Sequence, residues 1–335
     1  MQRPPVFLHC GWRSGSTYIW NKFRAQGDVL AFYEPFHERL ARCTAASILH
    51  DTEQAWDSRH PRLNAPYFAE YLPLLRGKGV ARYEDRFAVR RCFVQTQQPL
   101  DEAAYLASLL RLAESGGKQA VLGFARSLGR VGAIKRVFGG HHVVVIRDPV
   151  QQWLSARSQR LQHGSPYFEL GHLMILALAS PLSVAGRIAR WLQIPYVRFG
   201  SFGHQYRLLR RRFEPLDDEL SYRAFIAVYM LAYTKALRHA DVVIDMDRLS
   251  GSRPYAAALS DELLRASGVD LDFGDCSMPA HHRNVARLNM HAIHREVSER
   301  MLMEQSEVAP ELMPHDEAPR EDYEGPTATG APRRE

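Results

Sequence analysis

Residues that could bind a phosphate-like anion gather near the N-terminus, in the segment 10–18 (CGWRSGSTY). Gly15 lets the backbone approach an anion closely, and Ser16 and Thr17 add hydroxyl donors. The segment departs from the nucleotide-triphosphate loop G-x-x-x-x-G-K-[ST], because Ser16 stands where the lysine would be. The cation is Arg13, ahead of the glycine. A tight strand-to-helix turn without a ligand is the alternative interpretation.

A second cation follows the apolar run 142–146 (HVVVI). Arg147 ends that run, Asp148 is a good helix N-cap, and Pro149 suits the first helical position. Ser155 then falls near the second turn of the helix, where it and Arg147 could contact one anion from two elements. Alternatively, Arg147 caps a carbonyl group and Ser155 is a neutral helix residue.

A possible proton acceptor follows the apolar run 28–33. The proline after Glu34 disfavours helix there, so we expect Glu34 to be extended at the end of a strand. A carboxylate in that position could serve as a general base, and His37 is the second choice. Alternatively, Glu34 pairs with Arg13 or Arg126, and His37 is a helix cap.

The elements that position these residues are read from the pattern of apolar runs. Helical spacing separates the runs, which predicts an α/β protein with a P-loop-like three-layer fold: a central parallel sheet of about five strands flanked by helices. The carboxyl ends of such strands line a ligand crevice, where Arg126 and Arg130 would join the residues above. The expected strands are 5–9, 29–33, 120–124, 142–146 and 241–246. After the first helix, we expect helices at 100–114, 167–178, 182–193, 203–212, 217–239 and 254–267. We also expect one helix that ends at 138, one that begins at 149, and a last one that ends at about 304.

We expect a single domain over residues 1–305. Irregular segments at about 38–95 and 163–215 would form caps on this domain. Helical pieces are plausible at 38–48 and 66–76, and the stretch 77–91 is rich in Arg, Gly and Tyr, as a loop or lid would be. Residues 306–335 are acidic and proline-rich with few core residues, which predicts a disordered tail.

Composition excludes several classes of protein. The chain of 335 residues is 46% hydrophobic with a net charge of +6, typical of a globular protein, and its basic residues are interleaved with acids, unlike a nucleic-acid-binding stripe. Four separated cysteines and scattered histidines form neither a disulfide framework nor a metal-binding pattern, so we expect no metal. The apolar stretch 173–185 is too short to span a membrane, and no signal peptide is evident, so we expect a cytoplasmic protein.

Three segments together make the chain resemble the sulfotransferases that use 3′-phosphoadenosine 5′-phosphosulfate (PAPS). Residues 13–17 (RSGST) are similar to the family's loop for the 5′-phosphosulfate. Residues 144–149 (VVIRDP) with Ser155 are similar to its 3′-phosphate motif. Residues 33–37 (YEPFH) are similar to the segment after the second strand of carbohydrate sulfotransferases, where related branches keep an acidic base.

The resemblance implies transfer of a sulfuryl group from PAPS to an acceptor hydroxyl, of a carbohydrate or glycolipid, by in-line displacement. It implies Glu34 as the base, with His37 as second choice, and Arg13 at the leaving phosphate. A basic loop often closes over the cofactor in this family, and residues 281–283 (HHR) are the candidate here. The residues that would bind the donor are Arg13, Ser14, Gly15, Ser16, Thr17, Tyr18, Arg147 and Ser155.

Two other functions remain open. One is a phosphotransferase or nucleotide hydrolase of related fold. The missing lysine at Ser16 speaks against it, and Asp245 and Asp247 are the best remaining ligands for Mg²⁺. The other is a non-catalytic binding module that keeps the fold. The identity of the small-molecule or glycan acceptor and the oligomeric state are not predicted.

Overall fold

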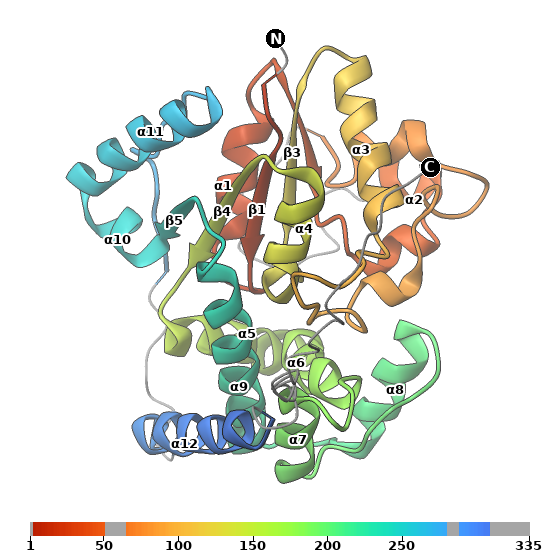
Figure 1. Ribbon diagram of the computed structural model, residues 1–335, viewed down its shortest axis with the longest axis vertical. Helices are drawn as coiled ribbons and strands as arrows, with labels where there is room; N and C mark the ends of the chain where they lie inside the picture. Colours follow the sequence, from red (N-terminus) through yellow and green to blue (C-terminus); the bar gives the residue numbers. More distant parts are fainter. Residues whose placement is uncertain (1–2, 51–64, 280–287, 309–335) are drawn as a thin grey trace, which may run out of the picture.

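A five-stranded parallel sheet forms the centre of the protein (Figure 1). The computed structural model describes residues 3–50, 65–279 and 288–308. The strand order is β2-β3-β1-β4-β5, and all four pairings are parallel. This confirms the α/β class, and each strand falls on one of the predicted runs. The strands are β1 (Val6–Cys10), β2 (Val29–Tyr33), β3 (Gln119–Phe124), β4 (His141–Ile146) and β5 (Val242–Asp245).

Helices cover both faces of the sheet, which gives the predicted three layers (Figure 1). On one face, the Phe7 ring of β1 lies 6.1 Å from the Phe138 ring of α4 (Val131–Phe138). On the other, Gly123 of β3 leaves room for Trp20 of α1 (Ser16–Arg24), since a Cβ at that glycine would lie 2.9 Å from the indole. The residues of β1 are all buried, as expected for a strand covered on both sides.

The strand order places a topological switch point at β1 and β4. The chain leaves β1 through α1 toward β2 on one side, and it leaves β4 toward β5 on the other. In open parallel sheets the crevice outside the strand ends at such a point is where ligands bind. The loops that begin at residues 11 and 147 therefore flank one crevice.

Six helices form a layer beyond the carboxyl ends of the strands, below the sheet in Figure 1. At its centre, α6 is buried from Glu169 to Ala177 and packs on α9. The apolar stretch 173–185 therefore begins as a core helix. Trp153, Tyr222 and Phe225 are buried with it, so aromatic side chains of the helix expected at 217–239 contribute to the core. The helices are α5 (Pro149–His163), α6 (Tyr167–Ala177), α7 (Val184–Trp191), α8 (Phe202–Arg212), α9 (Asp218–Leu237) and α12 (Met290–Val308).

The segment 38–95 departs most from prediction. The helix expected at 66–76 is a 3₁₀ segment, η2 (Ala69–Leu74), because Pro73 cannot continue an α-helix. The helix expected at 38–48 is broken into η1 (Glu38–Ala41) and α2 (Ala45–Leu49), the second capped by Thr44.

The remaining elements of the chain are η3 (Asp85–Phe87), α3 (Ala103–Ser115), η4 (Leu128–Arg130), α10 (Met246–Gly251) and α11 (Arg253–Ser267).

The last helix ends later than expected, since α12 reaches Val308 rather than stopping near residue 304. The tail expected from 306 onward otherwise lies outside the described residues, as do the basic residues 281–283. The division into one domain with two caps stays a prediction.

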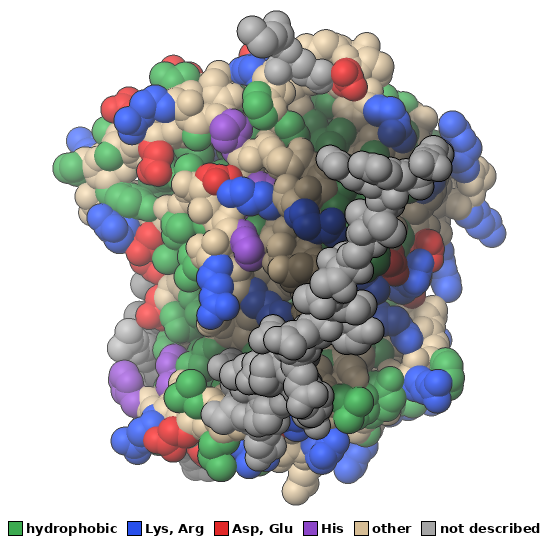
Figure 2. Space-filling model, in the orientation of Figure 1, with side chains coloured by type: hydrophobic (Ala, Val, Ile, Leu, Met, Phe, Trp, Pro, Cys, Tyr) green, Lys and Arg blue, Asp and Glu red, His purple; other side chains and the backbone are tan. Residues whose placement is uncertain are grey.

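On the face drawn in Figure 2, Lys and Arg side chains are interspersed with acidic and apolar ones.

Candidate functional site

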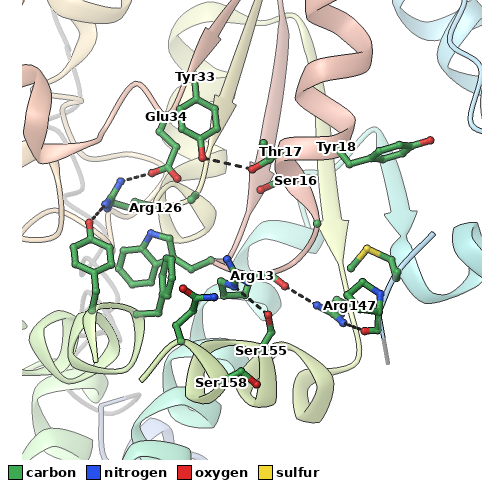
Figure 3. Close-up of a pocket in the computed structure, with 18 of the residues that line it drawn as sticks. Arg13, Ser16, Thr17, Tyr18, Tyr33, Glu34, Arg126, Arg147, Ser155 and Ser158 are labelled. Atoms are coloured by element: carbon green, nitrogen blue, oxygen red, sulfur yellow. Dashed lines mark hydrogen bonds and ion pairs between the residues drawn. The ribbon is translucent and has the colours of Figure 1, made fainter. Parts of the chain in front are cut away.

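A cavity of about 400 Å³ lies at the carboxyl ends of the strands (Figure 3). Residues from the loops after β1, β2, β3 and β4, from α5 and α6, and from the segment 275–279 line it. Of the residues predicted to bind the donor or to act as the base, all but Ser14 are among them. The marked residues on the wall are Arg13, Gly15, Ser16, Thr17, Tyr18, Glu34, His37, Arg147 and Ser155.

The loop after β1 opens the N-terminus of α1 toward this cavity. Gly15 is the N-cap, with a φ of 92°, and no side chain caps the helix there. The positive φ favours glycine at this position, and a Cβ there would lie 2.9 Å from the terminal methyl group of Met246. The first turn of α1 contains no acidic residue. Its outward N–H groups and the helix dipole therefore make this end of α1 suitable for an anion.

Two hydroxyl groups of the loop have different surroundings. Thr17 Oγ1 lies 3.5 Å from the Tyr33 hydroxyl at the cavity wall. Ser14 is fully buried behind the wall, and its Oγ has no hydrogen-bond partner among the described residues. An unsatisfied buried hydroxyl costs free energy, so the loop carries spare hydrogen-bonding capacity.

Arg13, Ser155 and Arg147 form one connected group, although up to 142 positions separate them in the sequence. Arg13 Nε donates to Ser155 Oγ at 3.0 Å, and Arg147 Nη1 donates to the Arg13 carbonyl at 3.0 Å. Arg147 Nη2 donates to the Pro279 carbonyl, also at 3.0 Å. The carbonyl-capping alternative is thus realised by both terminal nitrogens of Arg147.

Arg147 nevertheless keeps one unsatisfied donor. Its Nε has no hydrogen-bond partner among the described residues, and water cannot easily replace one because Arg147 is only 4% exposed. Burial lowers the pKa of the guanidinium, with partial compensation from Asp247 and Asp148. Arg147 lines the cavity, so its buried positive charge and orphaned N–H suit an anionic group there.

The expectation that Glu34 is extended is wrong. Its φ is 39°, in the left-handed region, because the chain turns sharply as it leaves β2. The Glu34 N–H donates to the Gly123 carbonyl at 2.7 Å, and the His37 N–H donates to the Glu34 carbonyl at 2.8 Å. The turn directs the carboxylate toward Arg126, whose Nη1 donates to Glu34 Oε2 (Figure 3). The pairing with Arg126, one of the alternatives above, is therefore present.

Four residues at this side of the cavity form what we call the Arg126 cluster: Glu34, Glu38, Arg126 and Tyr167. Arg126 Nη2 donates to Glu38 Oε2 at 2.9 Å and to the Tyr167 hydroxyl at 2.6 Å. That hydroxyl donates to Glu38 Oε1 at 2.6 Å. The guanidinium also lies over the Trp12 ring, 5.0 Å from its centroid. The cluster joins the strand ends to α6.

The two carboxylates of the cluster have opposite pKa shifts. Burial raises the pKa of Glu34, against the opposing attraction of Arg126, and the nearby charge of Glu38 raises it further. At Glu38 burial acts in the same direction, but His37, Arg126 and the Tyr167 hydrogen bond together leave its pKa below the usual value. Glu34 is thus the more basic carboxylate of the pair.

His37 is both a cap and a wall residue. Its Nδ1 accepts from the Arg39 N–H at 3.2 Å, which makes it the N-cap of η1, the alternative stated above. Burial lowers its pKa to about 3, so the ring is neutral at pH 7. Its Nδ1 also lies 3.2 Å from Glu38 Oε2, but a neutral ring that accepts at Nδ1 donates nothing there.

One wall of the cavity was not predicted from the sequence, and one residue that we expected at the crevice lies elsewhere. Arg130 does not line the cavity; it is fully buried and pairs with Glu102. The missed wall is a face of α5 that extends from Ser155 at helical spacing, so helical periodicity could have revealed it. Two aromatic residues of α6 face the same cavity. The residues of this wall are Ser158, Gln159, Gln162, His163, Tyr167 and Phe168.

Comparisons with known proteins add little. No protein-family model and no curated protein matches the sequence. Among solved structures, a sulfotransferase domain from the Synechococcus PCC 7002 olefin synthase aligns with a TM-score of 0.34 and 11% identity. The alignment covers 92% of this chain and 96% of that chain. So low a score and identity establish neither a shared fold nor a shared chemistry.

Two features of the described residues bear on membranes and metals. None of their helices combines the length and apolarity needed to cross a membrane. Nor do three of their His, Cys, Asp or Glu side chains come together in a group that could hold a metal ion.

Proposed function

We propose that the protein is a sulfotransferase that uses PAPS and transfers a sulfuryl group to a hydroxyl of a carbohydrate or glycolipid acceptor. The observation that carries the proposal is the convergence of Arg13, Arg147 and Ser155 with Glu34 on one cavity. These residues come from three segments far apart in the sequence. Two cationic positions suit a donor with two separated anionic groups, and a carboxylate suits a hydroxyl acceptor.

In this proposal the donor would lie along the wall formed by α1 and the start of α5. The uncapped N-terminus of α1 and Arg13 would hold the 5′-phosphosulfate, with Ser16 and Thr17 as hydroxyl donors. The unsatisfied Nε of Arg147 and the Ser155 hydroxyl would take the 3′-phosphate. When bound, PAPS supplies the activated sulfuryl group, and the chain supplies positioning and positive charge.

Glu34 is the proposed general base, with His37 as second choice. Glu34 would accept the proton of the acceptor hydroxyl while the acceptor oxygen bonds to the sulfur, the bond from sulfur to the 5′-phosphate oxygen breaks, and 3′,5′-adenosine bisphosphate leaves. A raised pKa makes a carboxylate a stronger base, and burial raises that of Glu34. His37 is also neutral and could accept a proton, but its Nδ1 already accepts from the Arg39 N–H. Positioning and charge stabilisation should contribute most of the remaining catalysis.

The cavity wall formed by α5 and α6 favours an uncharged, polyhydroxylated acceptor. Ser158, Gln159 and Gln162 present hydroxyl and amide groups, which hydrogen-bond well to sugar hydroxyls. Trp12 and Phe168 add aromatic surface to the same cavity. A neutral polar face beside aromatic rings favours a sugar ring over a charged or wholly apolar acceptor.

Arg147→Ala tests the donor site. We expect it to weaken binding of 3′,5′-adenosine bisphosphate much more than binding of AMP, because only the bisphosphate carries a 3′-phosphate. A lost charge-assisted hydrogen bond is worth about 1.5–3 kcal/mol, roughly 10- to 150-fold in Kd. Isothermal titration calorimetry measures both ligands. An equal loss of affinity for the two would argue against a 3′-phosphate site.

Glu34→Gln tests the base. The amide cannot accept the hydroxyl proton, so kcat should fall by about 10²–10⁴-fold. Transfer of labelled sulfate from PAPS to sugars and lipids of a cell extract would supply the assay, and the Kd of the bisphosphate should stay unchanged. Near wild-type turnover with normal donor binding would remove Glu34 from this role.

A further inference from the structure

Two carboxylates share a single guanidinium in the Arg126 cluster. Arg126 Nη1 donates to Glu34, while Nη2 donates to Glu38 at 2.9 Å. The Arg126 side chain is 1% exposed, and the two carboxylates are 14% and 15% exposed. Two anions and one cation leave the cluster with one uncompensated negative charge. In such a buried site a second carboxylate offsets much of the stabilisation that the guanidinium gives to the first.

Tyr167 completes the cluster on the side away from Glu34. Its hydroxyl accepts from Arg126 Nη2 at 2.6 Å and donates to Glu38 Oε1 at 2.6 Å. Nη2 is thus occupied by Glu38 and Tyr167, which leaves Nη1 for Glu34. Tyr167 is itself held by aromatic neighbours on α8, with ring centroids 6.3 Å away at Phe202 and 6.0 Å away at Tyr206.

We propose that Glu38 and Tyr167 are positioning residues, which hold Arg126 between two carboxylates and thereby keep Glu34 reactive as a base. The inference rests on the proposed function. Without Glu38, Arg126 would pair with Glu34 alone and would hold it ionised and weakly basic. With Glu38 present, the same guanidinium orients Glu34 through a hydrogen bond while its charge is largely offset.

Arg126 is the cation that acts most strongly on Glu34. The titratable groups that act on it come from five elements or loops: Arg126 after β3, Glu38 on η1, Tyr33 on β2, Cys10 on β1 and Tyr167 on α6. Burial raises the pKa of Cys10 to about 12 and raises that of both tyrosines, so these three are neutral at pH 7. The neighbouring His37 ring is also neutral. Glu38 is therefore the group that opposes Arg126.

Glu38→Gln tests this arrangement directly. The variant keeps the shape of the side chain and removes its charge, so the titration midpoint of the Glu34 carboxyl should fall. Carboxyl-detected ¹³C NMR of the full-length protein, with Glu34→Gln used to assign the resonance, measures the midpoint without any need for activity. The acid limb of the kcat profile should move to lower pH by the same amount. A midpoint that stays the same or rises would overturn the proposal.

Glu70→Gln is the matched control. Glu70 is also a buried glutamate paired with an arginine, since Arg24 Nε lies 2.7 Å from its Oε1, but it does not line the cavity. The control should leave the Glu34 midpoint and the kcat profile at their wild-type positions. An equal shift in this variant would mean that the effect is a general loss of charge and would contradict a specific role for Glu38.

Tyr167→Phe provides a second, structurally mild test, with the neighbouring Tyr206→Phe as its control. We expect a severalfold fall in kcat with an unchanged Kd for 3′,5′-adenosine bisphosphate, because the hydroxyl positions Arg126 and not the donor. The loss should stay below the about 10²-fold that removal of a general base costs. Unchanged kcat in Tyr167→Phe, or an equal loss in Tyr206→Phe, would refute the role of Tyr167. Failure of wild-type protein to bind the bisphosphate would instead count against the proposed function.

Discussion

Arg126 and Arg130 follow the same strand four positions apart, but they lie in different surroundings. Arg126 reaches the cavity wall and pairs with two carboxylates. Arg130 turns into the core, where it pairs with Glu102 and donates to the Phe87 carbonyl at 2.7 Å. Both residues of that pair are 0% exposed. Identical residue types at one strand end thus serve a site in one case and the packing of the segment 85–88 in the other.

Arg130→Met should destabilise the protein without removing a cavity residue. Methionine fills the space but leaves the Glu102 carboxylate buried without its cation, which costs about 3–5 kcal/mol of unfolding free energy. Urea denaturation followed by circular dichroism measures the loss. The double variant Arg130→Met/Glu102→Leu should recover much of it, because no charge remains unpaired. A single variant as stable as wild type would show that the pair contributes little.

The residues of the site were predictable to different degrees. Arg13 and Arg147 stand out because each follows an apolar run at a strand-to-helix junction, and the cavity contains both. The conformation of Glu34 was not predictable, since the rule for residues before proline describes an average and the turn after β2 is fixed by hydrogen bonds to Gly123 and His37. The sequence around Glu38 contains no pattern that would indicate its place in the site. Its place depends on Arg126, 88 positions away.

At the scale of elements, two neighbouring strands carry a chain of buried histidines. His9 of β1 lies between the Ser127 hydroxyl, 2.6 Å from its Nδ1, and His142 of β4, whose Nδ1 is 3.0 Å from His9 Nε2. His142 Nε2 lies 2.9 Å from the Gly139 carbonyl. Both rings are fully buried and nearly parallel, with their centroids 5.2 Å apart. Neutral rings can satisfy every one of these contacts, whereas two doubly protonated rings cannot, because His9 Nε2 and His142 Nδ1 would then both carry protons.

The histidine pair should make the protein sensitive to mild acid. Burial lowers the pKa of His142 to about 4 and lowers that of His9 well below 6.5. The unfolded chain therefore binds protons first, and the stability that the pair contributes above pH 6.5 is lost as pH falls toward 4. Each histidine should add up to about 1.4 kcal/mol per pH unit to the slope of unfolding free energy.

Chemical denaturation at several pH values measures that slope. His142→Phe should lower it between pH 6.5 and 4.5, although the variant loses stability at pH 7 through the missing hydrogen bonds. His204→Gln, at an exposed position of α8, is the control. A slope in His142→Phe equal to that of wild type would contradict this account.

The architecture of the whole molecule was largely predictable, because apolar runs separated by helical segments determine a parallel sheet. All five strands lie where the runs were found. The strand order could not be derived, since it depends on how crossovers pack on the two faces and not on any one segment. The short 3₁₀ pieces between Glu38 and Phe87 were missed because tertiary packing, not periodicity, holds them.

Ligand binding should stabilise the whole molecule, since the cavity joins both sides of the switch point with α5, α6 and the segment 275–279. Arg147 already links two of these parts through the carbonyls of Arg13 and Pro279. A ligand that binds only the folded state adds about 2.7 kcal/mol at one hundred times its Kd. We therefore expect 3′,5′-adenosine bisphosphate to raise Tm by several degrees, and ATP with Mg²⁺ to raise it less, because Ser16 replaces the lysine of a triphosphate loop. Differential scanning fluorimetry compares the two ligands. A larger rise with ATP and Mg²⁺, abolished by Asp245→Asn or Asp247→Asn, would favour the phosphotransferase alternative.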